Sequence, residues 1–315
     1  MNQIATNDAH SLKATNTLEA IEAWIAYERI EGLSEATLDT YERGLKIFAD
    51  WVIENGKSPT ASTLREFRFA MSEQYAAQTV NTWLSAVRSF FSFLVATERL
   101  PSNPASEIKS VKRSHSTRHK RDALTPAEVL SLLDTCEDST LGIRDRAMIT
   151  LMAYCALRIV EVHRANIDNL GSQSDRMVLE VWGKGRDEAD ELVIIPVSQE
   201  PVIRQWVSKR SLLRPKPDEI GDPLFLSLSN RTRGTRLSRR SISQVVRGKI
   251  REVGAVGKVS PHSLRHSAIT QAIQGGARPM QVRALARHQS FETTLNYIHE
   301  AARTDDPAED YIKYE

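Results

Sequence analysis

Cysteine is scarce in this sequence: Cys136 and Cys155 are the only two among 315 residues. Because they lack metal-ligand spacing and cannot form a disulfide framework, we interpret both as small buried side chains in a reducing compartment. Long apolar runs are also lacking, since no stretch approaches the roughly 20 apolar residues of a membrane-spanning helix. The N-terminus has neither the basic start nor the apolar core of a secretory signal. These absences predict a cytoplasmic protein with no membrane partner.

An excess of charge of one sign is missing too. The chain has 42 lysines and arginines against 40 aspartates and glutamates, a formal net charge of +2. A surface that binds nucleic acid must therefore come from local clustering of basic side chains. Residues 106–122 form the most basic run and predict a linker, which either lies along a DNA backbone or is merely a flexible tether. Its candidate DNA-binding residues are Lys109, Lys112, Arg113, Arg118, Lys120 and Arg121.

The rest of the sequence predicts two globular parts. A length of 315 residues and a hydrophobic content of 41% suffice for two domains. Apolar residues at helical spacing over 16–105 predict a bundle of about four helices. Residues 1–15 are expected to be flexible, and residues 300–315 form an acidic tail. The aromatic side chains of the bundle are expected in its core rather than as base-stacking platforms: Trp24, Trp51, Trp83, Phe90, Phe91 and Phe93.

Residues 123–299 predict a second domain that is mostly helical. Within it, 176–182 and 191–197 are rich in apolar and β-branched residues and predict two strands joined by a loop at 183–190. The expected fold class is therefore mainly α with a small antiparallel β-sheet.

Five residues of this second part stand in an order that suits phosphodiester chemistry: Arg158, His262, Arg265, His288 and Tyr297. Arginine forks neutralise non-bridging phosphate oxygens. Histidines donate hydrogen bonds or move protons near neutral pH, and a tyrosine hydroxyl can be a nucleophile that forms a covalent ester. The remaining histidines show no metal-ligand spacing. The set indicates attack on a phosphodiester without a metal or another cofactor.

Four segments give the local context of these residues. They read CALRIVEVHRANI (155–167), VWGKGRDEADELVIIPVS (181–198), SPHSLRHSAIT (260–270) and ALARHQSFETTLNYIH (284–299). They resemble the tyrosine recombinase family (phage integrase, Xer-like), whose marks are G-L-R-x-x-E, G-K-G, H-x-L-R-H, L-G-H and T-T-x-x-Y-x-H boxes. The resemblance covers about residues 120 to 300 and extends more weakly into the helical N-terminal half. H-x-L-R-H followed at this distance by H-x-x-x-x-T-T-x-x-Y is highly specific.

The resemblance implies the roles of the nucleophile and of the two arginines. Tyr297 would attack the phosphorus, form a 3′-phosphotyrosine and release a 5′-hydroxyl. Tyr311 and Tyr314 lie outside the motif, in the acidic tail. Arg158 and Arg265 would hold the non-bridging oxygens through bidentate contacts that lysine does not reproduce.

The resemblance also implies the roles of the supporting residues. Lys184 would protonate the leaving 5′-oxygen, although it could also be an exposed turn lysine, and Arg186 is a nearby competitor for the role. His262 would act as acid or base toward the tyrosine, and His288 would donate a hydrogen bond to the scissile phosphate. Glu161 would orient its neighbours rather than react.

Two residues depart from the family's motifs. Ala156 stands where glycine usually precedes the Leu-Arg pair, and Arg287 stands where glycine usually precedes His288. Alanine is tolerated wherever the backbone does not need a positive φ. Arg287 adds a charge beside the site and could either clash or contact a phosphate.

The family's architecture is a two-domain clamp on duplex DNA. By this resemblance, residues 16–105 are an N-terminal SAM-like core-binding domain and residues 123–299 an α+β catalytic domain. The family works as four protomers on two specific recombination sites, through a Holliday junction and without metal or nucleotide cofactor. We therefore expect a site-specific DNA recombinase that is a homo-tetramer on DNA.

The sequence leaves two rival functions open. A catalytically silent DNA-binding or architectural relative would form no covalent adduct with DNA. A type IB topoisomerase-like enzyme would relax any supercoiled plasmid, whereas a recombinase needs its site. The target sequence, the need for accessory proteins and the biological role (phage or transposon integration, plasmid or chromosome dimer resolution) stay undetermined.

Overall fold

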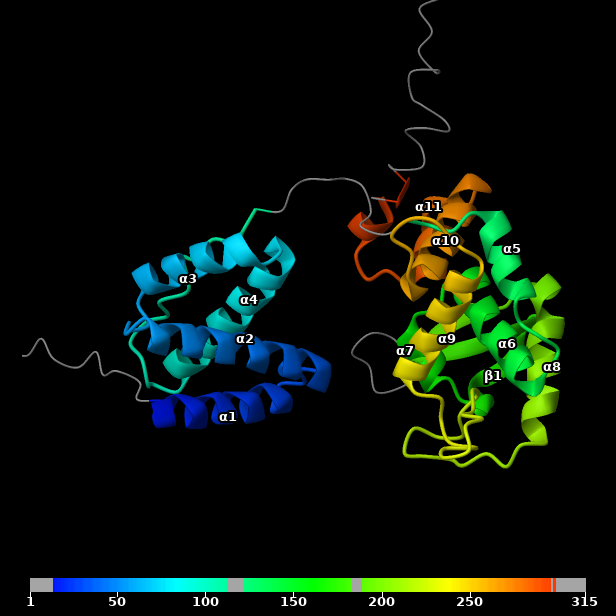
Figure 1. Ribbon diagram of the computed structural model, residues 1–315, viewed down its shortest axis with the longest axis horizontal. Helices are drawn as coiled ribbons and strands as arrows, with labels where there is room; N and C mark the ends of the chain where they lie inside the picture. Colours follow the sequence, from blue (N-terminus) through cyan, green and yellow to red (C-terminus); the bar gives the residue numbers. More distant parts are fainter. Residues whose placement is uncertain (1–13, 113–121, 183–188, 296, 299–315) are drawn as a thin grey trace, which may run out of the picture. The chain divides into compact units, whose positions relative to one another are not determined.

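The computed structural model describes residues 14–112, 122–182, 189–295 and 297–298. The chain forms two compact units that divide after residue 115, within the predicted linker. Figure 1 shows both units.

The N-terminal unit is a helical bundle, as predicted. Ser34 and Thr60 adopt extended backbone conformations, and each side chain accepts a hydrogen bond from the backbone N–H three residues later, which begins α2 and α3. The helices are α1 (Ala14–Ile30), α2 (Glu35–Glu54), α3 (Ala61–Gln74) and α4 (Ala77–Ala96).

Aromatic rings and one glycine shape the core of this bundle. A Cβ atom at Gly44 of α2 would lie 2.7 Å from Cδ1 of Trp83 on α4, so glycine lets these two helices approach closely. Trp24 is fully buried and stacks on Tyr41 with ring centroids 6.3 Å apart. The predicted core role of the aromatics is confirmed, because Trp51 packs against the core and the others are buried: Trp24, Trp83, Phe90, Phe91 and Phe93.

The first residues of the predicted linker pack onto this bundle. Ile108 is buried in its core, and the guanidinium of Arg88 donates a hydrogen bond to the Ile108 carbonyl at 2.7 Å. The side-chain amide of Asn81 accepts from the Val111 N–H at 2.7 Å and donates to its carbonyl at 3.0 Å. Residues 106–111 are thus held against α4, because Ile108 and Val111 provide apolar anchors within the basic run.

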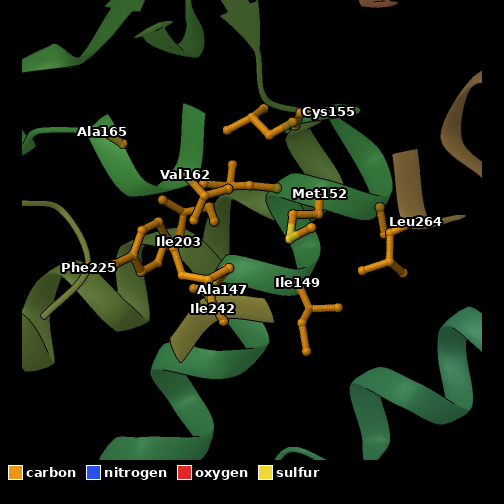
Figure 2. Close-up of a cluster of buried hydrophobic side chains, with 14 of the residues drawn as sticks. Ala147, Ile149, Met152, Cys155, Val162, Ala165, Ile203, Phe225, Ile242 and Leu264 are labelled. Carbon is orange, nitrogen blue, oxygen red and sulfur yellow. The ribbon is translucent and has the colours of Figure 1, made fainter. Parts of the chain in front are cut away.

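The second unit surrounds one central helix. The sequence of α6, TLGIRDRAMITLMAY, is apolar on most of its sides, which matches burial between α5, α7, α8 and α10. Figure 2 shows Ala147, Ile149 and Met152 of this helix among side chains from neighbouring helices. The helices are α5 (Pro126–Asp134), α6 (Thr140–Tyr154), α7 (Ile159–Arg164), α8 (Glu200–Ser211), α9 (Arg239–Glu252), α10 (Pro261–Gln274) and α11 (Pro279–Ala286).

An antiparallel sheet completes this unit: β1 (Leu170–Gln173), β2 (Arg176–Trp182) and β3 (Ala189–Ile194), in that order. Ser174 and Asp175 have φ angles of +48° and +60°, which fits a tight β1–β2 turn of the I′ kind. β2 has the predicted bounds. The prediction of 191–197 for the next strand is wrong at both ends, since the strand begins at Ala189 and ends at Ile194. It ends early because Pro196 has no N–H for strand pairing and a 3₁₀ turn (Val197–Gln199) follows it. β1 was not predicted.

The predicted fold class, mainly α with a small antiparallel sheet, is confirmed by these elements. None of the helices in the described ranges combines the length and apolarity needed to cross a lipid bilayer.

Candidate active site

Arg158 is held by the helix that it begins. It is the N-cap of α7, and its backbone N–H donates to Oε2 of Glu161 at 2.8 Å. Its Nη1 donates to Oε1 of the same carboxylate at 2.5 Å. The Arg158 side chain remains 30% exposed, so its guanidinium is oriented by Glu161 and still reachable by a ligand.

Arg265 reaches the same place from α10. It is only 2% exposed, and its guanidinium donates to the carbonyls of Ala156, at 2.5 Å, and Ala286. Burial, together with repulsion from Arg158 and Arg287, lowers the pKa of Arg265 to about 9. The side chain is therefore a cation at neutral pH, with its charge shielded from solvent.

The two arginines meet at the C-terminal end of α11. Nη2 of Arg158 donates to the carbonyls of Ala286 at 3.5 Å and Arg287 at 3.3 Å. Because the last carbonyls of a helix lack intrahelical partners and carry partial negative charge, they are suitable acceptors for cationic donors. The end of α11 therefore sets the spacing between the two arginine forks.

Tyr297 lies between two imidazole rings. The His266 ring contacts it edge-on with centroids 5.1 Å apart, and the His288 ring stacks on it at 5.8 Å and 25°. Tyr297 is 8% exposed and lies close enough to Arg265 for its charge to act on that guanidinium. Nδ1 of His288 lies 3.0 Å from Oγ1 of the buried Thr294.

His262 occupies the first turn of α10, where its side chain is exposed. It is near enough to His288 for its charge to act on that ring. The structure thus brings together the predicted catalytic residues that fall within its described ranges, with the supporting Glu161: Arg158, Glu161, His262, Arg265, His288 and Tyr297.

The pKa of His288 is lowered to about 4 by burial and then by the charges of Arg265, Arg158, Arg287 and His262. Between the ordinary value of 6.5 and this value, the unfolded chain binds a proton at this residue that the native protein does not. The free energy of unfolding of the DNA-free protein should therefore fall as pH drops from about 6.5 towards 4.

Urea unfolding at pH values between 7 and 4.5 would measure this effect. In His288→Gln the dependence on pH should be shallower, because glutamine does not titrate. Equal slopes in the two proteins would contradict the lowered pKa of His288.

Both departures from the family's motifs occupy left-handed backbone positions. Ala156 has φ +53° and Arg287 has φ +49°, where residues other than glycine are strained by about 1–2 kcal/mol. The condition under which alanine is tolerated, a backbone without a positive φ, is therefore not met at Ala156. The Arg287 side chain is only 4% exposed and turns inward, so it neither clashes nor is placed to reach a phosphate.

Some of the predicted residues cannot be placed. Lys184, its competitor Arg186 and four linker residues (Arg113, Arg118, Lys120 and Arg121) lie outside the described residues. Lys109 and Lys112 are exposed on the N-terminal unit. Within the described ranges, no group of three or more His, Cys, Asp or Glu side chains is arranged to hold a metal ion.

A second basic surface was missed in the sequence. Between residues 230 and 251 the chain has no acidic residue, and most of its basic side chains are exposed. Arg236 is an exception, because it is buried in a paired contact with Asp218 at 2.7 and 2.8 Å. The signal in the sequence was the long interval without acidic residues. Within this interval, helical spacing separates the basic residues instead of placing them in one continuous run. We define the α9 basic surface as the exposed arginines of α9 and of the segment that precedes it: Arg231, Arg233, Arg239, Arg240, Arg247 and Arg251.

Family models identify both parts of the chain. The model described as the phage integrase family matches residues 122–304, and the model of the phage integrase N-terminal SAM-like domain matches residues 21–98. The chain belongs to the phage integrase family. This membership confirms the predicted enzyme class, a tyrosine recombinase acting in site-specific DNA recombination.

Individual relatives resemble the recombinase over most of its length. It is 30% identical to tyrosine recombinase XerC of Pelobacter propionicus, over 90% of this chain and 91% of the relative. It is 27% identical to tyrosine recombinase XerD of Oceanobacillus iheyensis, over 89% and 93%.

Solved structures share the fold at lower identity. The XerH recombinase bound to palindromic difH substrate, a post-cleavage complex, gives a TM-score of 0.77 at 18% identity over 96% of this chain and 98% of that one. The Tn1549 transposon integrase with circular intermediate DNA gives 0.70 at 18%, over 93% and 99%.

Proposed function

We propose that the recombinase cuts and rejoins duplex DNA at specific sites through a covalent 3′-phosphotyrosine intermediate. The observation that carries this proposal is the meeting of Arg158 and Arg265 at the end of α11, with Tyr297 close to Arg265 and flanked by His266 and His288. Two cationic forks beside a phenol suit an attack on a phosphodiester, because they hold negative charge as it develops on the phosphate oxygens.

In the proposed reaction, the Tyr297 oxygen bonds to phosphorus as the P–O5′ bond breaks. The phenolic proton passes to His262, and Lys184 supplies the proton that converts the leaving 5′-oxygen into a hydroxyl. Attack by the 5′-hydroxyl of a partner strand reverses these steps and frees the tyrosine. Since the ester keeps the energy of the broken bond, rejoining needs no nucleotide cofactor.

The proposed working assembly is a homo-tetramer on two recombination sites, which exchanges strands in pairs through a Holliday junction. DNA as the partner is supported by the XerH and Tn1549 integrase structures, which are DNA complexes of proteins with the same fold. We place the reaction in the cytoplasm, at the nucleoid, with duplex DNA as the partner.

The α9 basic surface is proposed to contact the DNA backbone, because arginines that neutralise phosphates release bound counterions. Removing two such contacts in Arg239→Gln/Arg240→Gln should weaken binding and make the plot of log affinity against log salt shallower by about 2. Fluorescence anisotropy on one duplex at several salt concentrations measures this slope.

The matched control is Arg204→Gln, which removes a charge from the exposed side of α8. It should leave the slope unchanged. An unchanged slope in the double variant would show that its two arginines do not contact phosphates.

The experiment that tests the function uses suicide DNA substrates with a nick near a candidate crossover. Cleavage releases the short strand between the crossover and the nick, which carries the 5′-hydroxyl needed for rejoining. Because this strand diffuses away, the covalent adduct accumulates, and it survives denaturation. An adduct on a bound site supports the proposal. Binding without an adduct would establish a silent DNA-binding protein, and relaxation of plasmids that lack the site would indicate a topoisomerase.

A further inference from the structure

Arg287 makes contacts that an ordinary helix-ending residue does not make. It is the C-cap of α11, in the left-handed conformation, with φ and ψ both +49°. Its Nη1 donates to the carbonyls of Cys155 at 3.2 Å and Leu285 at 2.8 Å. Glycine would adopt this conformation more easily, so the side chain rather than the backbone accounts for what arginine adds here.

The other guanidinium nitrogen of Arg287 joins the groups that hold the two site arginines. Nη2 donates to Oε2 of Glu161 at 2.7 Å and to the Ala156 carbonyl at 2.9 Å. Oε1 of Glu161 accepts from the Arg158 guanidinium, Oε2 also accepts from the Arg158 backbone N–H, and the Ala156 carbonyl also accepts from Arg265 at 2.5 Å. Arg287 thus shares one acceptor with each of the two arginines.

The negative charge of Glu161 gives a second reason for the contacts of Arg287. Glu161 is buried, and burial raises its pKa, but the charges and hydrogen bonds of Arg287 and then Arg158 outweigh burial and leave the pKa lowered. Because Arg287 takes part of the negative charge of Glu161, the carboxylate can orient Arg158 without fully neutralising it. Nε of Arg287 lies 3.7 Å from Glu191 Oε2 on β3, which adds a weaker tie to the sheet.

We propose that Arg287 is a positioning residue: by fixing the Glu161 carboxylate and the Ala156 carbonyl, it holds Arg158 and Arg265 in the geometry that receives the scissile phosphate. This inference rests on the proposed DNA cleavage function. Arg287 itself does not touch the phosphate, because its side chain is buried behind Ala156 and Glu161.

The test compares Arg287→Gly and Arg287→Lys with the wild type. Glycine adopts the left-handed conformation without strain, so any loss of activity in Arg287→Gly comes from the missing side chain and not from the backbone. We expect Arg287→Gly to form the adduct about 10- to 100-fold more slowly in single-turnover cleavage at saturating protein, with little change in affinity for uncleaved DNA. Arg287→Lys should restore part of the rate, because its ammonium can still pair with Glu161. Arg204→Gln again serves as the control and should cleave at the wild-type rate.

The pH dependence distinguishes positioning from simple structural support. Glu161 is faced by Arg158 on its own helix, by Arg287, and by Arg265 from α10, while Glu191 faces Arg287 from β3. Without Arg287, Glu161 should accept a proton at higher pH and release Arg158. The acidic limb of the cleavage rate should therefore move to higher pH in Arg287→Gly, and adding Glu161→Gln should abolish that movement.

The possible outcomes separate this inference from the proposed function. If the wild type binds DNA but forms no adduct, the function itself is wrong. If the wild type cleaves and Arg287→Gly cleaves equally fast, the inference alone is overturned. It is also overturned if glycine and lysine variants lose the same activity with an unmoved acidic limb, since that pattern describes support of the fold only.

Discussion

Replacing Tyr297 by phenylalanine is expected to abolish the covalent protein–DNA adduct while leaving DNA affinity unchanged. The substitution removes only the hydroxyl, which is the proposed nucleophile. The phenyl ring keeps the contacts with His266 and His288, so the fold should be preserved. Adduct formation on a nicked substrate, resolved on a denaturing gel, measures the effect beside an affinity measurement on intact DNA.

Two control variants make this result specific. Tyr311→Phe and Tyr314→Phe change the tyrosines of the acidic tail and should leave adduct formation intact. An adduct that persists in Tyr297→Phe and disappears in one of the tail variants would assign the nucleophile to the tail instead.

Loss of Arg265 is expected to have the second largest effect. Arg265→Gln should slow cleavage by about 10²–10³-fold, the loss typical when one preorganised donor to a developing oxyanion is removed. Arg265→Lys should restore little of this rate, because an ammonium keeps the charge but not the planar fork. Single-turnover cleavage at saturating protein measures the change without a contribution from binding.

Folding must be separated from chemistry in this case, because Arg265 also donates to the Ala156 and Ala286 carbonyls. Thermal unfolding of each variant gives the stability loss. Arg158→Gln is the companion variant, since its side chain is 30% exposed and its removal disturbs the interior less. If folded Arg265→Gln cleaved within a few-fold of the wild type, the proposed phosphate contact of Arg265 would be refuted.

Much of the fold was readable because its patterns are local. Helical spacing of apolar residues predicted the bundle, and a run rich in apolar and β-branched residues gave the bounds of β2. β1 was missed because LGSQ is short and carries only one large apolar residue. β1 forms because it pairs with β2, and this contact is not visible in the local sequence pattern of β1.

In the site, too, some features could be predicted from local sequence and others depend on tertiary contacts. Motif spacing named Arg158, Arg265, His288 and Tyr297, and the structure brings them together; their catalytic roles remain predictions. The left-handed conformations of Ala156 and Arg287 could not be read, since neither residue favours a positive φ by itself. The inward direction of Arg287 depends on Glu161, which is 126 residues away in the sequence.

The hydrogen bond between Arg265 and the Ala156 carbonyl spans 109 residues. Contacts of such sequence separation form late in folding, because a long loop must close first. During synthesis, Arg158 and α7 emerge well before α10, α11 and Tyr297. The arginines of the proposed site therefore cannot take up their arrangement beside Tyr297 until synthesis has passed that residue, so the proposed strand breakage is confined to chains that carry it.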